Sequence, residues 1–429
     1  MTKQVQEAYI VATTRTPVGK APRGMMRNVR PDDMLAHVIK GALAQVPALD
    51  VNLIEDCVVG CAFPEAEQGL NMARIGVLLA GLPNTVGGVT INRYCSSGIN
   101  AVQMAADRIR TGEADVVIAA GAESMSMVPM MGNKVSPNPQ FAMELPQYYT
   151  NMGLTAENVS LKYGINPEVF AKDENFAIAY GMGLTAEKVA QQWNVSRADQ
   201  DAFAVESHRR AAAAIAAGEF KDEITPLDVT YRIPNLATGE VEYVKKTLTN
   251  DEGPRPDTTL EGLAKLKTVF DAKGSVTAGN SSQMSDGAGA VILVSEKILK
   301  QFNLTPLGKF ISFAVKGVPP AIMGIGPKEA IPAALKIAGL SKSDIAWMEL
   351  NEAFAAQALA VIRDLDLDTS LINPLGGAIA LGHPLGATGA IRTATLLHGM
   401  RRKGMAGKYG MITMCIGTGM GAAGIIQAL

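Results

Sequence analysis

Short apolar segments alternate along the chain with longer Ala-rich segments whose apolar positions recur at helical spacing. The apolar segments have the length of strands, and clear examples span residues 7–13, 56–61, 86–92 and 115–120. Alternation of buried strands with helices is typical of an α/β fold built on a largely buried sheet. We therefore predict the α/β fold class.

This pattern is interrupted between residues 127 and 271, where prolines and charges become frequent and helical patterns outnumber strand patterns. A Gly-rich turn and a strand then resume the first pattern. We predict a first half over residues 1–126 that is closed by residues 272–297, an inserted loop domain over residues 127–271, and a second α/β half over residues 298–429.

Two internal repeats support this division. The first repeat consists of a short motif, an amphipathic stretch and a strand. It occurs once with the motif at residues 95–99 and the strand at 115–120, and again with the motif at 387–390 and the strand at 411–414, which indicates two related halves. The second repeat is local, because Met-Gly-Leu-Thr-Ala-Glu occurs at residues 152–157 and again at 182–187. One extra pair cannot form a solenoid, so we interpret it as an enlarged loop.

Composition excludes several classes of protein. Of the 429 residues, 48% are hydrophobic and 19% are charged, against a usual charged share of about 25%, so a disordered chain is excluded. The net charge of -2 is far from that of a general nucleic-acid binder. There is no apolar run of about 18 residues and no secretory leader, so we expect a cytoplasmic protein without a membrane span.

The four cysteines are too few for a disulfide framework, and we expect free thiols in a reducing compartment. Cys57 and Cys61 lack the second close pair of a zinc site, so no metal is expected. Cys95 differs, because it lies between an apolar strand and a helical pattern over residues 97–110 that Gly112 can end. A helix N-terminus stabilises a thiolate, which makes Cys95 a candidate nucleophile. The alternative is a small buried hydrophobic residue.

His383 is the one histidine that lies among glycines. It belongs to the Gly-rich segment 382–389, and a second Gly-containing segment, 373–377, precedes it. Pro384 holds His383 in extended geometry, and a Gly-rich loop can approach a ligand closely. The alternative is a turn whose histidine caps the following helix. Asn351 follows a strand at residues 345–350 and could be either a site residue or a helix N-cap.

Cys415 follows a strand at residues 409–414 and precedes Gly-Thr-Gly-Met-Gly. A dinucleotide fingerprint would need a helix after these glycines, but only another apolar strand remains. Glycines beside a thiol instead allow a close backbone approach, with N–H groups free to bind a developing oxyanion. The alternative is a tight hairpin with an incidental cysteine.

Together, four motifs resemble those of the thiolases, in the order found in that family. They are Asn-Arg-Tyr-Cys-Ser-Ser-Gly at residues 92–98, Asn-Glu-Ala-Phe at 351–354, Gly-His-Pro-Leu-Gly-Ala-Thr-Gly at 382–389, and Cys-Ile-Gly-Thr-Gly at 415–419. The resemblance implies a five-layered αβαβα fold with a loop domain over the site, and a homodimer or homotetramer. It also implies coenzyme A and acyl-CoA as substrates, with no permanently bound cofactor.

The resemblance implies a role for each of these site residues. Cys95 would be the nucleophile that becomes an acyl thioester, and His383 would activate it. Cys415 would be the second acid/base. His383 and a water held by Asn351 would form one oxyanion hole, and the backbone N–H groups of Cys95 and Gly417 the other.

Substrate contacts are implied in the same way. Arg255 lies where the family places an arginine that contacts CoA, and Ser282 where it places a pantetheine contact. Many members of the acetoacetyl-CoA type have a histidine before the Met-Gly-x-Thr-Ala-Glu of the insertion, but Gly181 occupies that position here. Of the two copies, we predict that Met182 lines the acyl pocket, because the sequence after it matches relatives.

The motif variants are most similar to those of degradative 3-ketoacyl-CoA thiolases, which act in fatty acid β-oxidation and cleave 3-oxoacyl-CoA to acetyl-CoA and a shortened acyl-CoA. The biosynthetic acetyl-CoA acetyltransferase is the alternative within the fold. Ketoacyl synthases use two histidines beside the cysteine, and only one is found here. A non-catalytic acyl-CoA carrier is the alternative from a different class.

Overall fold

The computed structural model describes residues 5–130, 132–133, 182–234 and 238–429. Within these residues one ten-stranded mixed sheet runs through the molecule in the order β10-β11-β12-β9-β1-β8-β5-β3-β4, with β2 paired to β8. Its strands are β1 (Ala8–Arg15), β2 (Gly19–Lys20), β3 (Asp56–Gly60), β4 (Val89–Ile91), β5 (Val116–Ser124), β8 (Ser285–Ser295), β9 (Gly308–Gly317), β10 (Ile345–Leu350), β11 (Tyr409–Ile416) and β12 (Met420–Ala428).

This sheet consists of two halves that meet at a narrow junction. The halves are joined where β1 pairs with β9, through Tyr9 with Lys309 and Ile10 with Gly308. In the first half β5 is parallel to β3 and antiparallel to β8. In the second half β11 is parallel to β10 and antiparallel to β12. The strands that end the two predicted repeats, β5 and β11, thus occupy equivalent places.

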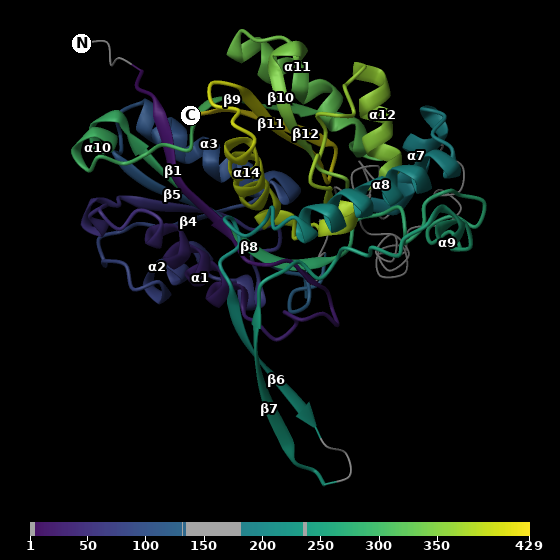
Figure 1. Cartoon of the computed structure of the whole chain (residues 1–429), viewed down its shortest axis with the longest axis horizontal. Coiled ribbons are helices and arrows are strands. Elements are labelled where there is room, and N and C mark those ends of the chain that lie inside the picture. Colours follow the sequence, from purple (N-terminus) through teal and green to yellow (C-terminus); the bar gives the residue numbers. More distant parts are fainter. Residues whose placement is uncertain (1–4, 131, 134–181, 235–237) are drawn as a thin grey trace, which may run out of the picture.

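Helices cover the two half-sheets in layers (Figure 1). Between the half-sheets lie α3 (Ser97–Arg110) and α14 (Leu385–Arg402), which contact each other and strands of both halves. The outer face of the first half is covered by α1 (Pro31–Ala44) and α2 (Met72–Leu79). The outer face of the second half is covered by α11 (Gly326–Ala338) and α12 (Ala355–Leu365). This arrangement confirms the predicted thiolase fold.

The central helices approach closely because glycines face each other at their crossing. A Cβ built on Gly389 would lie 2.0 Å from the backbone nitrogen of Ile99, and one on Gly98 would lie 2.6 Å from that of Ala390. Only a residue without a side chain fits at such a contact. The N-terminal ends of α3 and α14 are therefore held side by side, and each follows a predicted site residue, Cys95 or His383.

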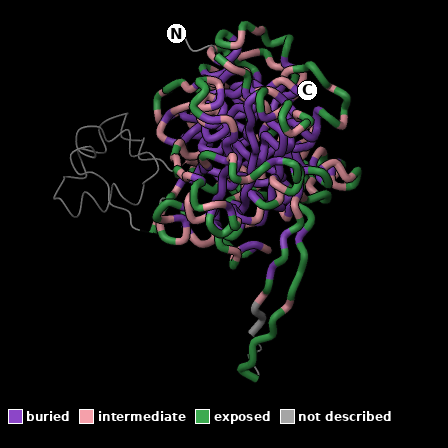
Figure 2. Tube along the Cα trace, turned by 90° about the vertical axis from the view of Figure 1, so that its left-hand side faces the viewer, coloured by how far each residue is buried: buried purple, intermediate pink, exposed green. Residues whose placement is uncertain are grey.

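The remaining described elements surround this layered body. They are α7 (Met182–Gln192), α8 (Arg197–Ala216), α9 (Leu260–Ala264), α10 (Glu296–Gln301), α13 (Ala378–Leu381), and the 3-10 helices η1 (Val51–Leu53), η2 (Ala66–Gln68), η3 (Tyr94–Ser96), η6 (Pro320–Ile325) and η7 (Lys342–Asp344). A hairpin of β6 (Leu227–Pro234) and β7 (Val241–Leu248) projects from the body and is largely exposed towards its tip (Figures 1 and 2). The sequence pattern did not predict this hairpin.

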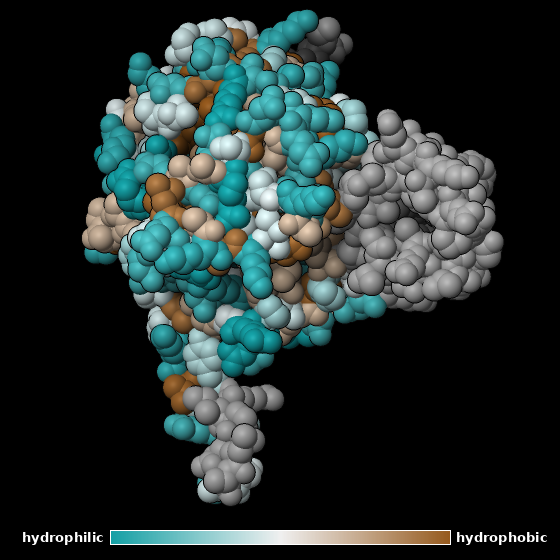
Figure 3. All heavy atoms as spheres, turned by 90° about the vertical axis from the view of Figure 1, so that its right-hand side faces the viewer, coloured by the Kyte–Doolittle hydropathy of each residue, from teal (hydrophilic) through white to brown (hydrophobic). Residues whose placement is uncertain are grey.

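The burial pattern follows the layers. Buried residues concentrate in the interior of the body, and exposed residues follow its periphery and the projecting hairpin (Figure 2). The interior includes β5 and β8, which are buried throughout, and most of α14. Hydrophobic residues on the face in Figure 3 are scattered among hydrophilic ones, as expected for a folded surface. Among the described helices, none combines the length and apolar character needed to cross a bilayer.

Two local expectations need correction. The strand expected over residues 86–92 is limited to Val89–Ile91, because Gly87 and Gly88 press against Asp56 and Arg74 before the pairing with β3 begins. Asn351 is not a helix N-cap, since α12 begins only after Phe354. The first Met-Gly-Leu-Thr-Ala-Glu copy, at residues 152–157, lies outside the described residues.

Candidate active site

Cys95 lies in η3, in the short connection between β4 and α3. The backbone turns sharply there, because Tyr94 has a φ of 44°, a left-handed conformation that non-glycine residues rarely adopt. The Cys95 side chain is buried, and the backbone N–H groups of Gly417 and of Cys95 itself point at its sulfur. Gly417 belongs to the turn between β11 and β12, so this contact joins the two halves.

Burial raises the pKa of the Cys95 thiol to about 12, although the two N–H groups act in the opposite direction. The buried carboxylate of Glu123 adds to the increase. At neutral pH the sulfur is therefore a protonated thiol, and it needs a base to become a nucleophile.

His383 lies between α13 and α14, directly before the N-terminal end of α14. The left-handed Gly382, with a φ of 91°, allows the chain to turn against the Ser285 side chain. The Ser285 hydroxyl oxygen accepts a hydrogen bond from the His383 backbone N–H at 3.1 Å. The backbone that carries the imidazole is thereby fixed to β8.

Hydrogen bonds at both ring nitrogens determine the tautomer of His383. The Asn351 amide nitrogen lies 3.3 Å from Nε2, and the Thr388 hydroxyl lies 2.7 Å from Nδ1. An amide N–H can only donate, so Nε2 accepts and Nδ1 carries the proton donated to Thr388. Burial, with a smaller contribution from Arg392, lowers the pKa of His383 to about 3. The imidazole is therefore neutral, with a basic nitrogen at Nε2.

Asn351 follows β10 and has one unused hydrogen-bonding group. Its amide nitrogen contacts His383, whereas its side-chain oxygen is buried and accepts no hydrogen bond from the described residues. A buried oxygen without a partner is costly unless a water or ligand satisfies it. This oxygen can therefore hold a water beside the imidazole.

Cys415 lies in β11, paired with Gly421 of β12. Burial and the nearby Cys95 sulfur raise the pKa of Cys415 above its usual value. The effect of Cys95 on Cys415 indicates that the two sulfurs lie near each other, which agrees with the contact of η3 with β11. Apolar side chains adjoin Cys415, namely those of Met182, Ala186, Val276, Met323, Ala353 and Phe354.

Met182 was predicted to line the acyl pocket, and it begins α7 beside the apolar cluster that contains Cys415. The Glu187 carboxylate of the same helix accepts hydrogen bonds from the backbone N–H groups of Ser275 and Val276. This second Met-Gly-Leu-Thr-Ala-Glu copy is thus fastened to the loop that leads to Ser282.

Ser282 and Arg255 lie further from the groups around Cys95 than Met182 does in the proposed arrangement of the site. The Ser282 backbone N–H donates to the Ala353 carbonyl, next to the Asn351 loop. Arg255 is exposed, and its loop reaches the site through Gly253, whose Cβ would lie 2.1 Å from the carbonyl of Ala380. Ser282 therefore adjoins the site, whereas the Arg255 side chain lies at its periphery.

Two buried glutamates were missed by the sequence analysis. Glu123 accepts hydrogen bonds from the backbone N–H groups of Ala62 and Gly386, which ties the first half to the His383 loop. Glu352 accepts hydrogen bonds from the Ser207 hydroxyl and the Asn373 side-chain amide, and a Cβ on Gly377 would lie 2.0 Å from its carboxyl carbon. The position of Glu123 at the end of a strand was the one available signal.

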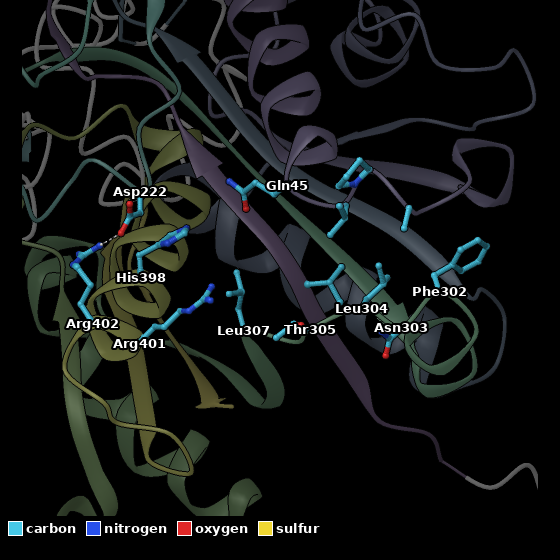
Figure 4. Close-up of a pocket in the computed structure, with 14 residues that line it drawn as sticks. Gln45, Asp222, Phe302, Asn303, Leu304, Thr305, Leu307, His398, Arg401 and Arg402 are labelled. Carbon is cyan, nitrogen blue, oxygen red and sulfur yellow. Dashed lines mark ion pairs between the residues drawn. The ribbon is translucent and has the colours of Figure 1, made fainter.

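A cavity of about 900 Å³ lies elsewhere, at the C-terminal end of α14 (Figure 4). His398, Arg401 and Leu307 contribute to its lining, and none of the predicted site residues does. In the part of the chain described here, no group of three or more His, Cys, Asp or Glu side chains could hold a metal ion. Because this cavity contains none of the predicted site residues, we take the groups around Cys95, and not the cavity, as the candidate active site.

Comparison with known proteins identifies the class to which this fold and site belong. Residues 8–297 match the family model "Thiolase, N-terminal domain", and residues 304–428 match "Thiolase, C-terminal domain". The chain belongs to the thiolase family.

Particular relatives span almost the whole chain. The 3-ketoacyl-CoA thiolase of Bacillus subtilis (strain 168) is 50% identical over 424 residues, which are 99% of this chain and 100% of the relative. The crystal structure of human mitochondrial 3-ketoacyl-CoA thiolase in complex with CoA is 37% identical, with a TM-score of 0.80, over 99% of this chain and 98% of that one. A Bacillus anthracis acetyl-CoA acetyltransferase structure is 34% identical, with a TM-score of 0.83, over 100% of both chains.

Proposed function

We propose that this protein is a degradative 3-ketoacyl-CoA thiolase, which cleaves 3-oxoacyl-CoA with coenzyme A to acetyl-CoA and a shortened acyl-CoA. One observation carries the proposal. The buried Cys415 thiol is affected by the Cys95 sulfur, and the Gly417 N–H points at that sulfur. The helix that follows His383, α14, also contacts η3, which carries Cys95, and this supports a common site. The identity to relatives named 3-ketoacyl-CoA thiolase supports the same reaction.

Acyl transfer begins at Cys95. The Nε2 atom of His383 accepts the thiol proton, and the sulfur attacks the 3-oxo carbon of the substrate. The bond between C2 and C3 then breaks, which leaves an acyl thioester on Cys95 and the enolate of acetyl-CoA. Cys415 donates its proton to C2 of the enolate, and acetyl-CoA departs.

The second half of the reaction restores both thiols. The Cys415 thiolate takes the proton of the incoming coenzyme A thiol, whose sulfur attacks the acyl thioester. Cys95 leaves as a thiolate and regains its proton from the His383 imidazolium. The enzyme returns to its starting protonation state, so no other reagent is needed.

Two sets of donors stabilise the oxyanions. The protonated Nε2 of His383 and a water held by Asn351 bind the enolate oxygen. The backbone N–H groups of Cys95 and Gly417 bind the tetrahedral intermediate at the acyl-enzyme, since both already point at the sulfur. Such fixed donors in a dry site cost no reorganisation during the reaction.

We propose that coenzyme A extends from Cys95 past Ser282 to Arg255, with the acyl chain beside Met182. We further propose a homodimer, possibly paired into a homotetramer. The low charged fraction and the partly exposed edge strand β4 support an assembly. All four cysteines are free thiols, which supports a reducing compartment such as the cytoplasm.

A steady-state assay across chain lengths tests the degradative assignment. We expect thiolysis of 3-oxoacyl-CoA substrates from four carbons to much longer chains. Activity confined to acetoacetyl-CoA would instead favour the biosynthetic acetyl-CoA acetyltransferase. The similarity to the Bacillus anthracis acetyl-CoA acetyltransferase structure supports this alternative. If there is no turnover and Cys95 is inert to iodoacetamide, the protein is an acyl-CoA carrier.

Substitution of Cys415 separates the two thiol roles. We expect Cys415→Ser to form the acyl-enzyme at Cys95 but to lose exchange of the acetyl-CoA α-protons by about 10³-fold or more, because a serine hydroxyl is a far weaker acid than a thiol. Mass spectrometry of the acylated Cys95 peptide and deuterium exchange from D₂O measure the two steps. Loss of acylation as well would contradict the assignment, and Cys57→Ser serves as the matched control.

A further inference from the structure

The cavity of about 900 Å³ at the C-terminal end of α14 opens where the two half-sheets separate. β1 pairs with β9 at Tyr9 and Ile10, and its register against β8 shifts between Ile10 and Ala12. Such a shift bends a strand and redirects the side chain at that point. Val11 lies at the shift and lines the cavity. The cavity is therefore built into the junction of the halves, and its volume is within the range of about 300–1,000 Å³ that is typical of small-molecule sites.

Hydrogen bonds to β1 fix two walls of this cavity. The Thr13 carbonyl accepts a hydrogen bond from Nε2 of His398 on α14, at 2.9 Å, and another from the Gln45 side-chain amide at the end of α1, at 3.0 Å. The Gln45 side-chain oxygen accepts the Thr13 backbone N–H in return, at 3.2 Å. Both side chains line the cavity. Because these walls are already held in place, a ligand does not have to order them when it binds.

Cations gather at one end of the cavity. Arg401 is exposed in the last turn of α14, and in the part of the chain that the structure describes its guanidinium has neither a hydrogen bond nor a carboxylate within 4.0 Å. The next residue, Arg402, contacts Glu219 through Nε at 2.7 Å, and its Nη1 lies 3.7 Å from Asp222 (Figure 4). Its two Nη atoms are buried and form no hydrogen bond with the described residues. This end therefore offers guanidinium nitrogens that the protein itself does not satisfy.

Apolar side chains continue the cavity from this end. Leu307, Leu304 and Phe302 lie one after another away from Arg401, along the segment between α10 and β9 (Figure 4). Leu307 is buried, and Leu304 packs against the hydrophobic core. A molecule that fills the cavity must therefore present a polar group to the guanidinium end and an apolar part to the leucines.

The acidic side chains beside Arg402 select the charge of the polar group. A doubly charged phosphate would be repelled by Glu219 and Asp222, which already accompany this cation. A carboxylate carries a single charge, and its two oxygens match the fork of N–H groups on a guanidinium such as that of Arg401. The cavity thus fits an aliphatic monocarboxylate.

We propose that this cavity binds a free fatty acid, with its carboxylate at Arg401 and its alkyl chain along Leu307 and Leu304. The cavity lies at the opposite end of α14 from His383, and none of the predicted site residues lines it. Fatty acid binding there is therefore a property beyond the proposed thiolysis and does not depend on it.

Titration calorimetry with decanoate tests this site, in the presence of saturating coenzyme A to fill the proposed active site. We expect one saturable binding event per chain, with a Kd that rises about tenfold in Arg401→Gln because one charge-assisted contact is lost. Lys336→Gln is the matched control, since it removes an exposed charge from the last turn of another helix, α11. Its Kd should stay within about twofold of that of the wild type, because a distant exposed charge is screened.

Both parts of the ligand are needed for binding. Decanol, which lacks the charge, and acetate, which lacks the chain, should each bind at least about tenfold more weakly than decanoate. Ala48 is an exposed residue of the cavity lining, so a larger side chain there fills part of the cavity without entering the core. We expect Ala48→Phe to weaken decanoate binding by about tenfold as well.

Three results would overturn the site. They are no saturable binding of decanoate, an equal Kd in the wild type and Arg401→Gln, and binding that coenzyme A abolishes, which would place the acid in the acyl pocket. Arg401→Gln leaves every group around Cys95 in place, so its thiolysis rate should equal that of the wild type. A protein that binds decanoate at Arg401 but cleaves no 3-oxoacyl-CoA would contradict the proposed function and leave this site intact.

Discussion

The reactive residues of this protein rest in neutral forms. Burial raises the pKa of Cys95 and lowers that of His383, so each group loses its charged form at pH 7. The imidazole offers an unprotonated Nε2, and the thiol keeps its proton until substrate arrives. A neutral pair avoids the cost of a buried charge in the empty site.

This neutrality predicts a pH dependence for chemical modification. The Cys95 thiolate fraction rises about tenfold per pH unit while the pH remains below a pKa of about 12. We expect the rate of alkylation by iodoacetamide to rise with this slope from pH 7 to 9.5, without a plateau. The rate is measured by stopping the reaction at successive times and mapping the alkylated peptides. Cys57, which is also buried, serves as the unreactive control.

A plateau above pH 6 would instead show that a thiolate–imidazolium pair already exists in the free enzyme. Acetyl-CoA should slow the modification of Cys95 at every pH, because acylation blocks the sulfur.

For single residues, the sequence predicted the identity of the candidate site side chains better than their hydrogen-bond partners. Glycines around His383 and the strand-to-helix position of Cys95 were visible as patterns. Asn351 could be a site residue or a helix N-cap from its sequence position. The structure distinguishes the two, because its amide nitrogen contacts His383. For Glu123 the available signal was its position near the end of a strand, and that position does not distinguish a buried glutamate from an exposed one.

At the scale of elements, the crossing of α3 and α14 connects the two halves of the site. The atoms nearest to a Cβ on Gly98 belong to the backbone of α14, so no side chain can move to make room. We expect Gly98→Ala to lower the free energy of unfolding by about 3 kcal/mol and to reduce thiolysis, because the helices would separate. Urea unfolding measures the change.

Gly262→Ala is the control for this substitution. Gly262 lies in α9, and the nearest atom to its Cβ would be the Thr259 hydroxyl at 3.2 Å. We expect a change within about 0.5 kcal/mol there. Equal effects at Gly98 and Gly262 would show that the close crossing is not a constraint.

Helices and buried strands were predicted well where their patterns are strong. The helix expected over residues 97–110 and the strand expected over 345–350 are α3 and β10 with the same bounds. The β6–β7 hairpin was missed because β7 is exposed along most of its length and carries frequent charges, so its sequence does not show the apolar pattern of a buried strand. The domain boundaries stay a prediction.

At the scale of the whole molecule, a buried ionic network fastens the segments that carry Glu223 and Asp251 to β1. The Arg15 guanidinium is 2% exposed and contacts both carboxylate oxygens of Asp251, at 2.7 and 2.9 Å, and Glu223 at 2.7 Å. Both carboxylates come from the segment between the halves, and Arg15 comes from β1. The network therefore sets the start of the loop that carries Arg255.

We expect Asp251→Asn to destabilise the fold by about 3 kcal/mol, since it leaves a buried guanidinium with one carboxylate. It should also raise the KM for coenzyme A, because the Arg255 loop begins at this residue. Urea unfolding and steady-state kinetics measure the two effects. Asp222→Asn, at an exposed carboxylate 3.7 Å from Arg402, should change stability by less than about 0.5 kcal/mol; a similar loss there would contradict the role of the network.

The position of β12 has a consequence for how the molecule is made. This strand follows every other described strand in sequence, yet it lies inside the sheet, between β11 and β9. A polypeptide emerging from the ribosome must leave both neighbouring edges unpaired until residues 420–428 are released. The first half can assemble during synthesis, but Cys95 stays without the Gly417 amide and the second thiol until β11 and the turn after it have emerged.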